Sequence, residues 1–350
     1  MKAAVWYEKG DIRIEDKPVP EPGPGEVRLK VKACGICGTD LHEYRDGPFL
    51  IPRKPHPLTG RAGGPIILGH EYSAVVDALG PEVSGVNPGD RVTVNPLIYC
   101  GKCPYCLKGQ LNMCLKLGTG GLASDGAFAE YTVVPGYGLY PLPEKVSDDA
   151  GAFVEPVAVA THAVKRARLE LGQSVAVIGA GPIGLLVAQV CRAAGASQVF
   201  VVEPMEARRN LAARLGATAV IDPTEADPGK AIAGLTDNLR ADVAIDCVGN
   251  QASFDTAVKA TGRRAVICIA GMALKPVEVS FMRLWGHEKE LTFTSGYENE
   301  FPAAIALLNN NQINTADMIT GNIGLDDLVS KGLEALSSQA GNHIKILVHP

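Results

Sequence analysis

The residues with the clearest chemical potential are four cysteines within the short segment 99–115. They follow the pattern C-x2-C-x2-C-x7-C at Cys100, Cys103, Cys106 and Cys114. Four thiolates at this spacing can close a tetrahedron around Zn²⁺ with no open position, which is typical of a structural site. A disulfide pair or inert thiols would be the alternatives, but a reducing compartment disfavours the first and the polar segment disfavours the second. The spacing therefore predicts a structural zinc.

A second set of possible metal ligands is spread widely along the chain and consists of Cys37, His70 and Glu155. A thiolate, an imidazole and a carboxylate can hold zinc and leave a fourth position for water or substrate, as a catalytic site requires. Each residue could also have a role unrelated to metal binding. Cys34 and Cys37 could form a redox C-x-x-C pair, His70 could be a turn residue, and Glu155 could be a helix-start carboxylate. Spacing alone leaves these alternatives open.

A glycine-rich segment fits the pattern G-x-G-x-x-G, and its characteristic residues are Gly179, Gly181, Pro182, Ile183 and Gly184. It follows an apolar β-branched run and opens an apolar helix, which is the context that gives the pattern meaning. The glycines permit a tight turn, a close approach to a pyrophosphate and close helix–strand packing, and the helix N-terminus favours phosphate. The alternative is a glycine-rich turn in an α/β domain that binds no nucleotide.

An acidic residue, Glu203, lies at the end of the next expected strand, about 20 residues after the last glycine of that motif. A carboxylate there can accept hydrogen bonds from the adenosine ribose hydroxyls and would repel a 2′-phosphate, so NAD is favoured over NADP. Arg208 and Arg209 lie close enough to weaken this preference, and Arg208 is interpreted as a further cofactor-binding residue.

The elements that must position these residues change character along the chain. Up to about residue 150, short apolar runs such as 27–33, 72–78 and 91–95 are separated by Pro/Gly turns, which predicts β-structure. From residue 174 strands alternate with helices, which indicates parallel βαβ units. The predicted strands are 174–178, 198–202, 218–221, 242–246 and 264–269, and the predicted helices are 183–194, 205–215 and 252–260. A helix near 301–310 and a final strand at 343–348 complete the chain.

Length and charge narrow the class of protein. The 350 residues suit two domains, and the net charge of −5 comes without a cluster of Lys or Arg. Nucleic-acid and anionic-membrane binding both depend on clustered positive charge, so neither is expected. Apolar runs such as 185–190 are too short to span a membrane, and the first residues do not look like a signal peptide. The sequence therefore predicts a cytoplasmic protein.

Taken together and in order, these motifs closely resemble the zinc-containing medium-chain alcohol dehydrogenases. The resemblance covers essentially the whole chain and rests on five segments: 37–42 (CGTDLH), 69–71 (GHE), the four cysteines, 154–156 (VEP) and 179–184 (GAGPIG). Liver-type enzymes carry a cysteine at the position of Glu155. A glutamate there resembles the polyol and butanediol branch. The segments 42–52 and 55–60 resemble the (R,R)-2,3-butanediol dehydrogenases in particular, although some of those have lost cysteines of the structural lobe and this chain keeps all four.

The resemblance implies an α/β fold with a GroES-like β domain (residues 1–157 and 298–350) that carries both zinc sites. A doubly wound Rossmann domain (158–297) would bind NAD. It implies two zinc ions per subunit, the catalytic one held by Cys37, His70 and Glu155.

The resemblance also implies that zinc lowers the pKa of the alcohol and that hydride passes to the nicotinamide. Thr39 would receive the released proton and pass it through the ribose to His42. Thr39 could also be a helix N-cap. Glu71 is interpreted as an outer partner that orients the zinc site, with the role of alternate ligand as the second possibility. The other histidines are interpreted as structural or surface residues.

The implied activity is oxidation of a secondary alcohol or vicinal diol of the 2,3-butanediol type, or reduction of the matching ketone, by a homodimer or homotetramer. A sorbitol-like polyol dehydrogenase or an L-threonine 3-dehydrogenase is the alternative within the family. A nucleic-acid-binding zinc protein conflicts with the acidic charge. A non-catalytic relative that binds only a dinucleotide would lack the zinc ligands.

Overall fold

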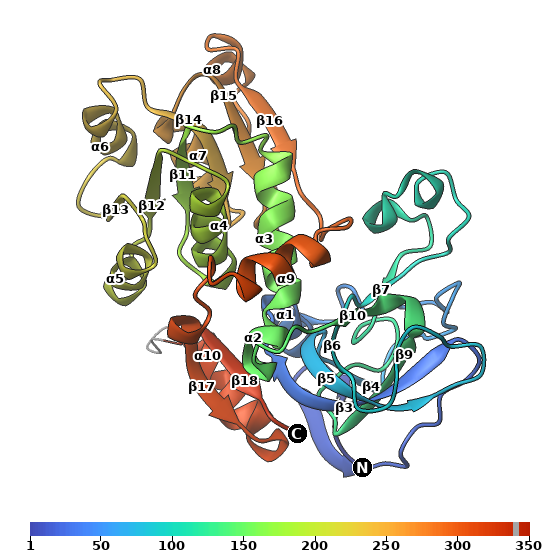
Figure 1. Cartoon of the computed structure of the whole chain (residues 1–350). Helices are drawn as coiled ribbons and strands as arrows, with labels where there is room; N and C mark the ends of the chain where they lie inside the picture. The colour runs from blue at the N-terminus through green and yellow to red at the C-terminus, as the bar shows by residue number, and fades with distance from the viewer. Residues whose placement is uncertain (339–342) are drawn as a thin grey trace. The chain divides into compact units, whose positions relative to one another are not determined.

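The computed structural model describes residues 1–338 and 343–350 and divides into two compact units (Figure 1). Unit 1 comprises Met1–Glu155 and Ile319–Pro350, and unit 2 comprises Pro156–Met318. The segment 298–318, assigned above to the N-terminal domain, therefore lies in unit 2. Two contacts tie it there: His162 Nδ1 lies 3.1 Å from Glu300 Oε1, and the Asn314 N–H donates to Gln189 Oε1 at 2.7 Å.

Unit 1 is built mainly from β-strands. Its larger sheet has the order β10-β6-β5-β3-β18-β17, with β9 also paired to β3. The bounds are β3 Glu26–Gly35, β5 Glu71–Leu79, β6 Arg91–Val94, β9 Tyr131–Pro135, β10 Leu139–Pro141, β17 Ile319–Ile323 and β18 Lys345–Val348. A second sheet has the order β2-β1-β4, with bounds Asp11–Asp16, Lys2–Glu8 and Ile66–Ile67. A short pair joins β7 (Leu97–Ile98) to β8 (Gly118–Thr119).

The C-terminal strand β18 closes unit 1 by pairing antiparallel with β3, where Leu347 faces Gly35. Strand β3 alternates buried and more exposed residues along its length, as a strand with one face on a core does. Its buried residues Val27, Leu29 and Val31 pack in one cluster with Trp6 and Phe128. This core fixes the strand ends that carry the candidate metal ligands.

Two helices, α1 (Gly38–Asp46) and α2 (Asp148–Ala152), interrupt a region that the sequence predicts as β throughout. Helix α1 is short and largely polar, so no apolar repeat marks it. It begins at Cys37, the N-cap, whose backbone N–H donates to Asp40 Oδ2 at 2.9 Å. Reading Thr39 as the N-cap is therefore wrong, since Thr39 lies inside the first turn.

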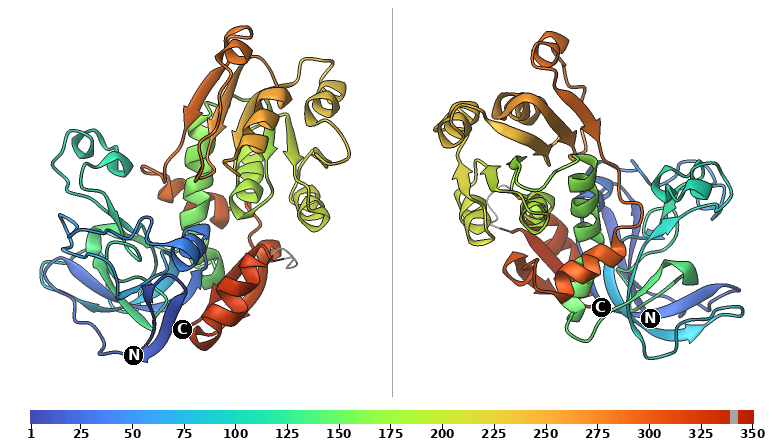
Figure 2. Two further views of the ribbon diagram at one scale, coloured as in Figure 1. Left: turned by 180° about the vertical axis from the view of Figure 1, so that it is seen from behind. Right: turned by 45° about the horizontal axis from the view of Figure 1, so that its top comes forward.

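Unit 2 contains a parallel sheet with the order β13-β12-β11-β14-β15-β16, which confirms the predicted doubly wound arrangement. The strands are β11 Ser174–Ile178, β12 Gln198–Val202, β13 Ala219–Ile221, β14 Ala241–Asp246, β15 Thr261–Ile269 and β16 Glu290–Phe293. The helices are α3 Val154–Arg166, α4 Pro182–Ala193, α5 Glu206–Arg214, α6 Pro228–Leu235, α7 Gln251–Ala260, α8 Phe281–Trp285 and α9 Phe301–Asn309. Helices lie against both faces of this sheet (Figure 2).

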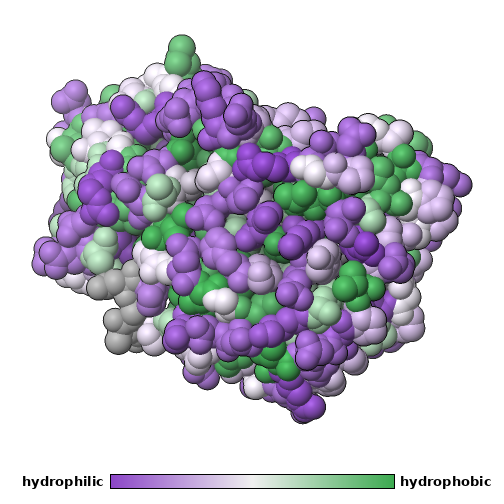
Figure 3. All heavy atoms as spheres, turned by 60° about the horizontal axis from the view of Figure 1, so that its bottom comes forward, coloured by the Kyte–Doolittle hydropathy of each residue, from purple (hydrophilic) through white to green (hydrophobic). Residues whose placement is uncertain are grey.

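The surface mixes polar and apolar residues in small groups on the face shown in Figure 3. In the described part of the chain, no helix combines the length and the apolar character that crossing a bilayer would need.

Candidate active site and metal centres

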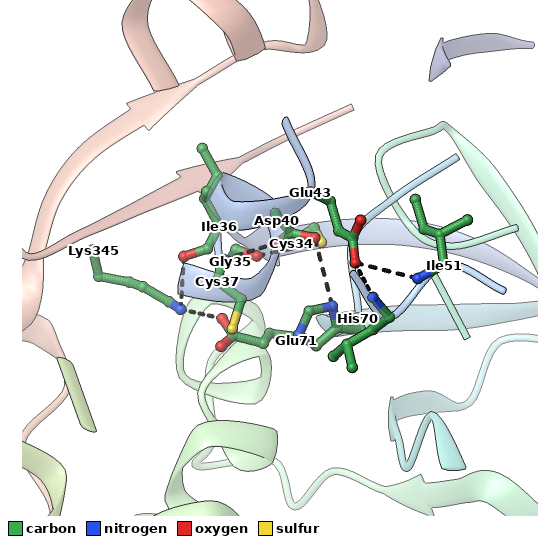
Figure 4. Close-up of polar contacts among 11 residues, drawn as sticks. Cys34, Gly35, Ile36, Cys37, Asp40, Glu43, Ile51, His70, Glu71 and Lys345 are labelled. Carbon is green, nitrogen blue, oxygen red and sulfur yellow. Dashed lines mark hydrogen bonds and ion pairs between the residues drawn. The ribbon is translucent and has the colours of Figure 1, made fainter. Parts of the chain in front are cut away.

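The first turn of α1 and the start of β5 bring three possible metal ligands together. Cys37, His70 and Glu71 each offer one ligand atom, and these three atoms lie within 4.8 Å of one another (Figure 4). Cys37 is half-buried, and His70 and Glu71 are buried. Burial of the thiol, followed by the nearby charge of Glu71, raises the pKa of Cys37. A cation would reverse that preference and favour the thiolate, so this donor set suits zinc.

Asp40 faces the imidazole of this cluster from inside α1. Its side chain is completely buried, and Asp40 Oδ1 lies 3.6 Å from His70 Nδ1. Neither of these two atoms has a hydrogen-bond partner among the described residues. Burial of the ring lowers the pKa of His70, but the charges of Asp40 and Cys37 outweigh it and raise that pKa well above its usual value. A carboxylate at Nδ1 fixes the ring and leaves its second nitrogen for a metal.

Glu71 is engaged in a buried ion pair with Lys345, which comes from β18. Lys345 Nζ also donates to the Ile36 carbonyl at 3.0 Å. Burial lowers the pKa of Lys345, but the negative charge of Glu71 outweighs it and the pKa rises. Gly35 makes room for the pair, because a Cβ there would lie 2.6 Å from Glu71 Oε2 and 2.7 Å from Lys345 Cε.

Glu155, the carboxylate that the resemblance places on the catalytic zinc, lies at the start of α3 and is buried. Its charge contributes to the raised pKa of both His70 and Lys345, so it lies in the same electrostatic environment. The third place in the mutually close cluster is nevertheless held by Glu71. The structure thus brings Cys37, His70 and the Glu71 carboxylate together, with the charge of Glu155 acting on the same site.

The two residues expected to carry a proton, Thr39 and His42, both lie on α1 and are half-buried. The His42 ring meets the ring of Phe49 edge-on, with centroids 6.3 Å apart and planes at 78°.

The four clustered cysteines have ligand atoms within 4.8 Å of one another. Cys103 Sγ and Cys106 Sγ are 3.5 Å apart, and Cys114 Sγ accepts N–H bonds from Cys100 and Lys116 at 3.3 Å. Backbone N–H donors lower the pKa of Cys103 to about 6, while burial raises the pKa of Cys106 to about 12. All nine cysteines of the chain are thiols. Four converging thiols with N–H···S bonds fit a structural zinc.

The glycine motif lies at the carboxyl end of β11, where Gly179 has φ +93°. Gly184 Cα approaches the Gly179 carbonyl so closely that no Cβ would fit. Glu203 is buried, and its carboxylate accepts N–H bonds from Ala180 at 2.7 Å and Met205 at 3.0 Å. Glu203 therefore braces the glycine loop from inside. Arg208 is half-buried, and its Nε has no hydrogen-bond partner among the described residues.

A third cluster of possible ligands lies in unit 2 and joins His162, Glu298 and Glu300. Lys165 Nζ lies 3.1 Å from Glu300 Oε1 and 3.5 Å from Glu298 Oε2, so both carboxylates already pair with a lysine of the chain. This cluster links α3 to the N-terminus of α9 and agrees with the interpretation of His162 as structural.

Sequence reasoning missed two residues of the candidate site, Asp40 and Lys345. Asp40 lies within the segment 37–42, but nothing in its residue type distinguishes it from a surface carboxylate. Lys345 had a usable signal, because it is the one charge within the apolar run 344–348. A buried lysine needs a partner, and the sequence does not say that Glu71 is that partner.

Comparison with known proteins agrees with this geometry. The family model of the alcohol dehydrogenase GroES-like domain matches residues 23–144, and that of zinc-binding dehydrogenases matches residues 182–310. The (R,R)-butanediol dehydrogenase of Bacillus subtilis is 38% identical over 352 residues, covering 100% of both chains. A sorbitol dehydrogenase of the same organism is 31% identical, covering 100% of this chain and 97% of the other.

Solved structures give the same result. A crystal structure of 2R,3R-butanediol dehydrogenase from Bacillus subtilis matches with a TM-score of 0.93 at 38% identity, covering 100% of this chain and 99% of that one. A zinc-binding dehydrogenase of Sinorhizobium meliloti, described as bound to NADP, matches with a TM-score of 0.91 at 32% identity and the same coverage. The GroES-like and Rossmann expectations are confirmed. The chain belongs to the zinc-binding alcohol dehydrogenases, and it is an oxidoreductase of that family.

Proposed function

We propose that the protein is a zinc- and NAD-dependent dehydrogenase that interconverts a secondary alcohol or vicinal diol of the 2,3-butanediol type and the matching ketone, such as acetoin. The observation that carries this proposal is that Cys37, at the N-cap of α1, meets His70 and the buried carboxylate of Glu71 at the start of β5. Similarity to the Bacillus butanediol dehydrogenase over the full chain supports the choice of substrate.

The catalytic zinc would be held by Cys37, His70 and Glu155, and a structural zinc by the four clustered cysteines. Glu155 is preferred over Glu71 as third ligand because Glu71 pairs with Lys345. If the Glu71 carboxylate moved to a metal, the buried ammonium of Lys345 would lose its ion pair and keep its bond to the Ile36 carbonyl. Removing one partner of a buried ion pair is unfavourable. Glu71 then acts as an outer partner of the site.

When bound, zinc lowers the pKa of the substrate hydroxyl toward neutrality, and the nicotinamide supplies the hydride acceptor. The chain itself positions the groups and manages the proton. The Asp40 carboxylate, 3.6 Å from His70 Nδ1, would favour a proton on that nitrogen and so orient the ring. The Thr39 hydroxyl would accept the proton that the substrate loses while giving up its own hydroxyl proton toward His42. His42 would release a proton to solvent, since an imidazole can exchange a proton near neutral pH.

The dinucleotide would bind at the glycine loop, with its pyrophosphate on the N-terminus of α4. NAD is favoured over NADP because the carboxylate of Glu203 lies at the end of β12, where a 2′-phosphate would be repelled. The N–H bonds from Ala180 and Met205 support this proposal, since they hold the carboxylate in one place. Arg208 is the residue that opposes it. The Sinorhizobium neighbour is described as bound to NADP, and an Escherichia coli neighbour as complexed with NADH.

A substrate panel tests the proposal. We expect kcat/KM for 2,3-butanediol and acetoin with NAD to exceed the values for sorbitol, for L-threonine and for NADP, and chelation of the catalytic zinc to abolish turnover. A dominant sorbitol or threonine activity would reassign the enzyme within the family. Activity that survives complete loss of zinc would refute the metal chemistry.

The protein would act in the cytoplasm as a homodimer or homotetramer. Support for self-association comes from the edge strand β16, where Phe293 is 60% exposed, and from α8, where Phe281 and Trp285 are 78% and 76% exposed. An edge strand flanked by apolar side chains is suited to pairing with a second copy. Light scattering would measure the molar mass of the wild type and of the variant W285D in solution. A monomeric wild type would contradict self-association.

A further inference from the structure

The carboxylate of Glu43, on the second turn of α1, is completely buried and is held by backbone amides. Its Oε2 accepts the N–H of Phe49 at 2.9 Å, and its Oε1 accepts the N–H of Leu50 at 2.5 Å. Oε1 also accepts the N–H of Ile51 at 3.2 Å (Figure 4). A buried carboxylate is costly unless its oxygens are hydrogen-bonded, so these three bonds justify its position.

The backbone around Glu43 strengthens this arrangement. Its carbonyl accepts Trp6 Nε1 at 3.2 Å and the Gly47 N–H at 3.1 Å. At Gly47 the backbone passes close to the Glu43 side chain, because a Cβ there would lie 2.5 Å from Glu43 Oε2. Residues 47–51, here called the Glu43 loop, therefore fold around one side chain.

The Glu43 loop presents two apolar side chains outward although its amides are held inside. Phe49 and Leu50 are 47% and 52% exposed. The ring of Phe49 contacts His42, one residue before Glu43, edge to face. Because the Phe49 N–H is one of the three donors to Glu43, the carboxylate fixes the backbone from which that ring extends.

We propose that Glu43 is a positioning residue for His42: by holding the Glu43 loop, it keeps Phe49 against the imidazole and so sets the orientation and solvent access of that ring. The inference rests on the proposed function, in which His42 passes the substrate proton to solvent. Glu43 then affects proton release without touching substrate, cofactor or zinc.

Four variants separate this role from simple anchoring of a loop. Glu43→Ala removes all three acceptor bonds. Glu43→Gln keeps one oxygen, which can still accept from Leu50 and Ile51. Phe49→Ala removes the ring but leaves the carboxylate, and Asp46→Asn is the control, since it changes an exposed charge on the same helix. Phe49→Ala and Glu43→Gln keep the test valid if Glu43→Ala does not fold.

Three measurements are made on the full-length protein. Chymotryptic cleavage after Phe49 and Leu50 reports opening of the loop. NMR titration of the His42 ring, assigned among the seven histidines by comparison with H42Q, reports its environment in the resting protein. The pH profiles of kcat and kcat/KM report proton release.

We expect cleavage to be about tenfold faster or more in Glu43→Ala, because each unsatisfied buried N–H favours the open loop. The His42 titration and the pH profile of kcat should shift together by about half a pH unit or more, with KM changing less. Phe49→Ala should give the same shifts, Glu43→Gln smaller ones, and Asp46→Asn none.

Faster cleavage with an unchanged His42 titration and pH profile would overturn the proposal, because Glu43 would then only anchor the loop. Unchanged cleavage in Glu43→Ala would also overturn it. If the wild type oxidised no diol, the proposed function would fail, but the NMR titration would still decide whether Glu43 positions His42.

Discussion

Asp40 illustrates how much of the candidate site depends on a residue that would not bind the metal. It accepts the N–H of Cys37 with one oxygen and faces His70 with the other, so one buried carboxylate positions both proposed ligands. Such outer partners fix the ring orientation of a metal-bound histidine and increase its basicity.

The substitution Asp40→Asn tests this role. The amide oxygen can still accept the Cys37 N–H, but the NH₂ group would then face His70 Nδ1 and impose the other tautomer. We expect kcat/KM to fall about 10- to 100-fold and the catalytic zinc to bind more weakly. Steady-state kinetics and zinc titration measure the two effects, with Asp46→Asn as the control. Wild-type kinetics and zinc affinity in Asp40→Asn would show that Asp40 does not orient the site.

At the scale of elements, α3 and α9 are connected by the buried contact between His162 and Glu300. Burial raises the pKa of Glu300, but hydrogen bonds from His162 and Lys165 outweigh this and lower it to about 2. A carboxyl whose pKa is lower in the folded state stabilises the fold above its unfolded pKa, and that contribution is lost as the pH falls from about 4.5 to about 2.

We therefore expect Glu300→Gln to be less stable than the wild type at pH 7, by on the order of 3 kcal/mol at most. Its stability should also fall less between pH 5 and about 2. Chemical denaturation across this pH range measures the difference, and Glu225→Gln, at an exposed position, is the control. Parallel pH dependences of Glu300→Gln and the wild type would contradict the stabilising pair.

The loop of four cysteines is a second element whose stability is open to test. The loop contains two short 3₁₀ turns, η1 (Cys106–Lys108) and η2 (Leu111–Met113). Because such turns add little stability, a bound zinc would be the main interaction that holds the loop folded. We expect Cys106→Ser to lose one zinc per chain and to be cleaved within residues 99–115 about tenfold faster or more. Cys191→Ala, a buried cysteine of α4, should change neither quantity. Equal zinc content in Cys106→Ser and the wild type would refute a structural site.

Elements with a strong local pattern were predictable from the sequence. Strand β11 and helix α4 were expected within one residue of their observed bounds, because a β-branched run, a glycine turn and a proline-started helix each leave a local signal. Helix α1 left no such signal, since its buried face consists of Asp40 and Glu43 rather than apolar residues.

At the scale of the whole molecule, the metal-ligating types could be found from motifs, but their partners could not. Lys345 and Glu71 are 274 residues apart, and only the pairing of β18 with β3 explains why they meet. The same holds for Glu155, whose place relative to Cys37 and His70 depends on where α3 begins. Spacing along a chain carries no information about such contacts, whereas local motifs carry their own geometry.

The most direct test of the central claim is the zinc content of Cys37→Ser, measured together with its turnover. The account predicts two zinc ions per chain in the wild type and one in Cys37→Ser, with turnover abolished and NAD binding retained. Two zinc ions and wild-type turnover in Cys37→Ser would contradict a catalytic metal at Cys37 and His70.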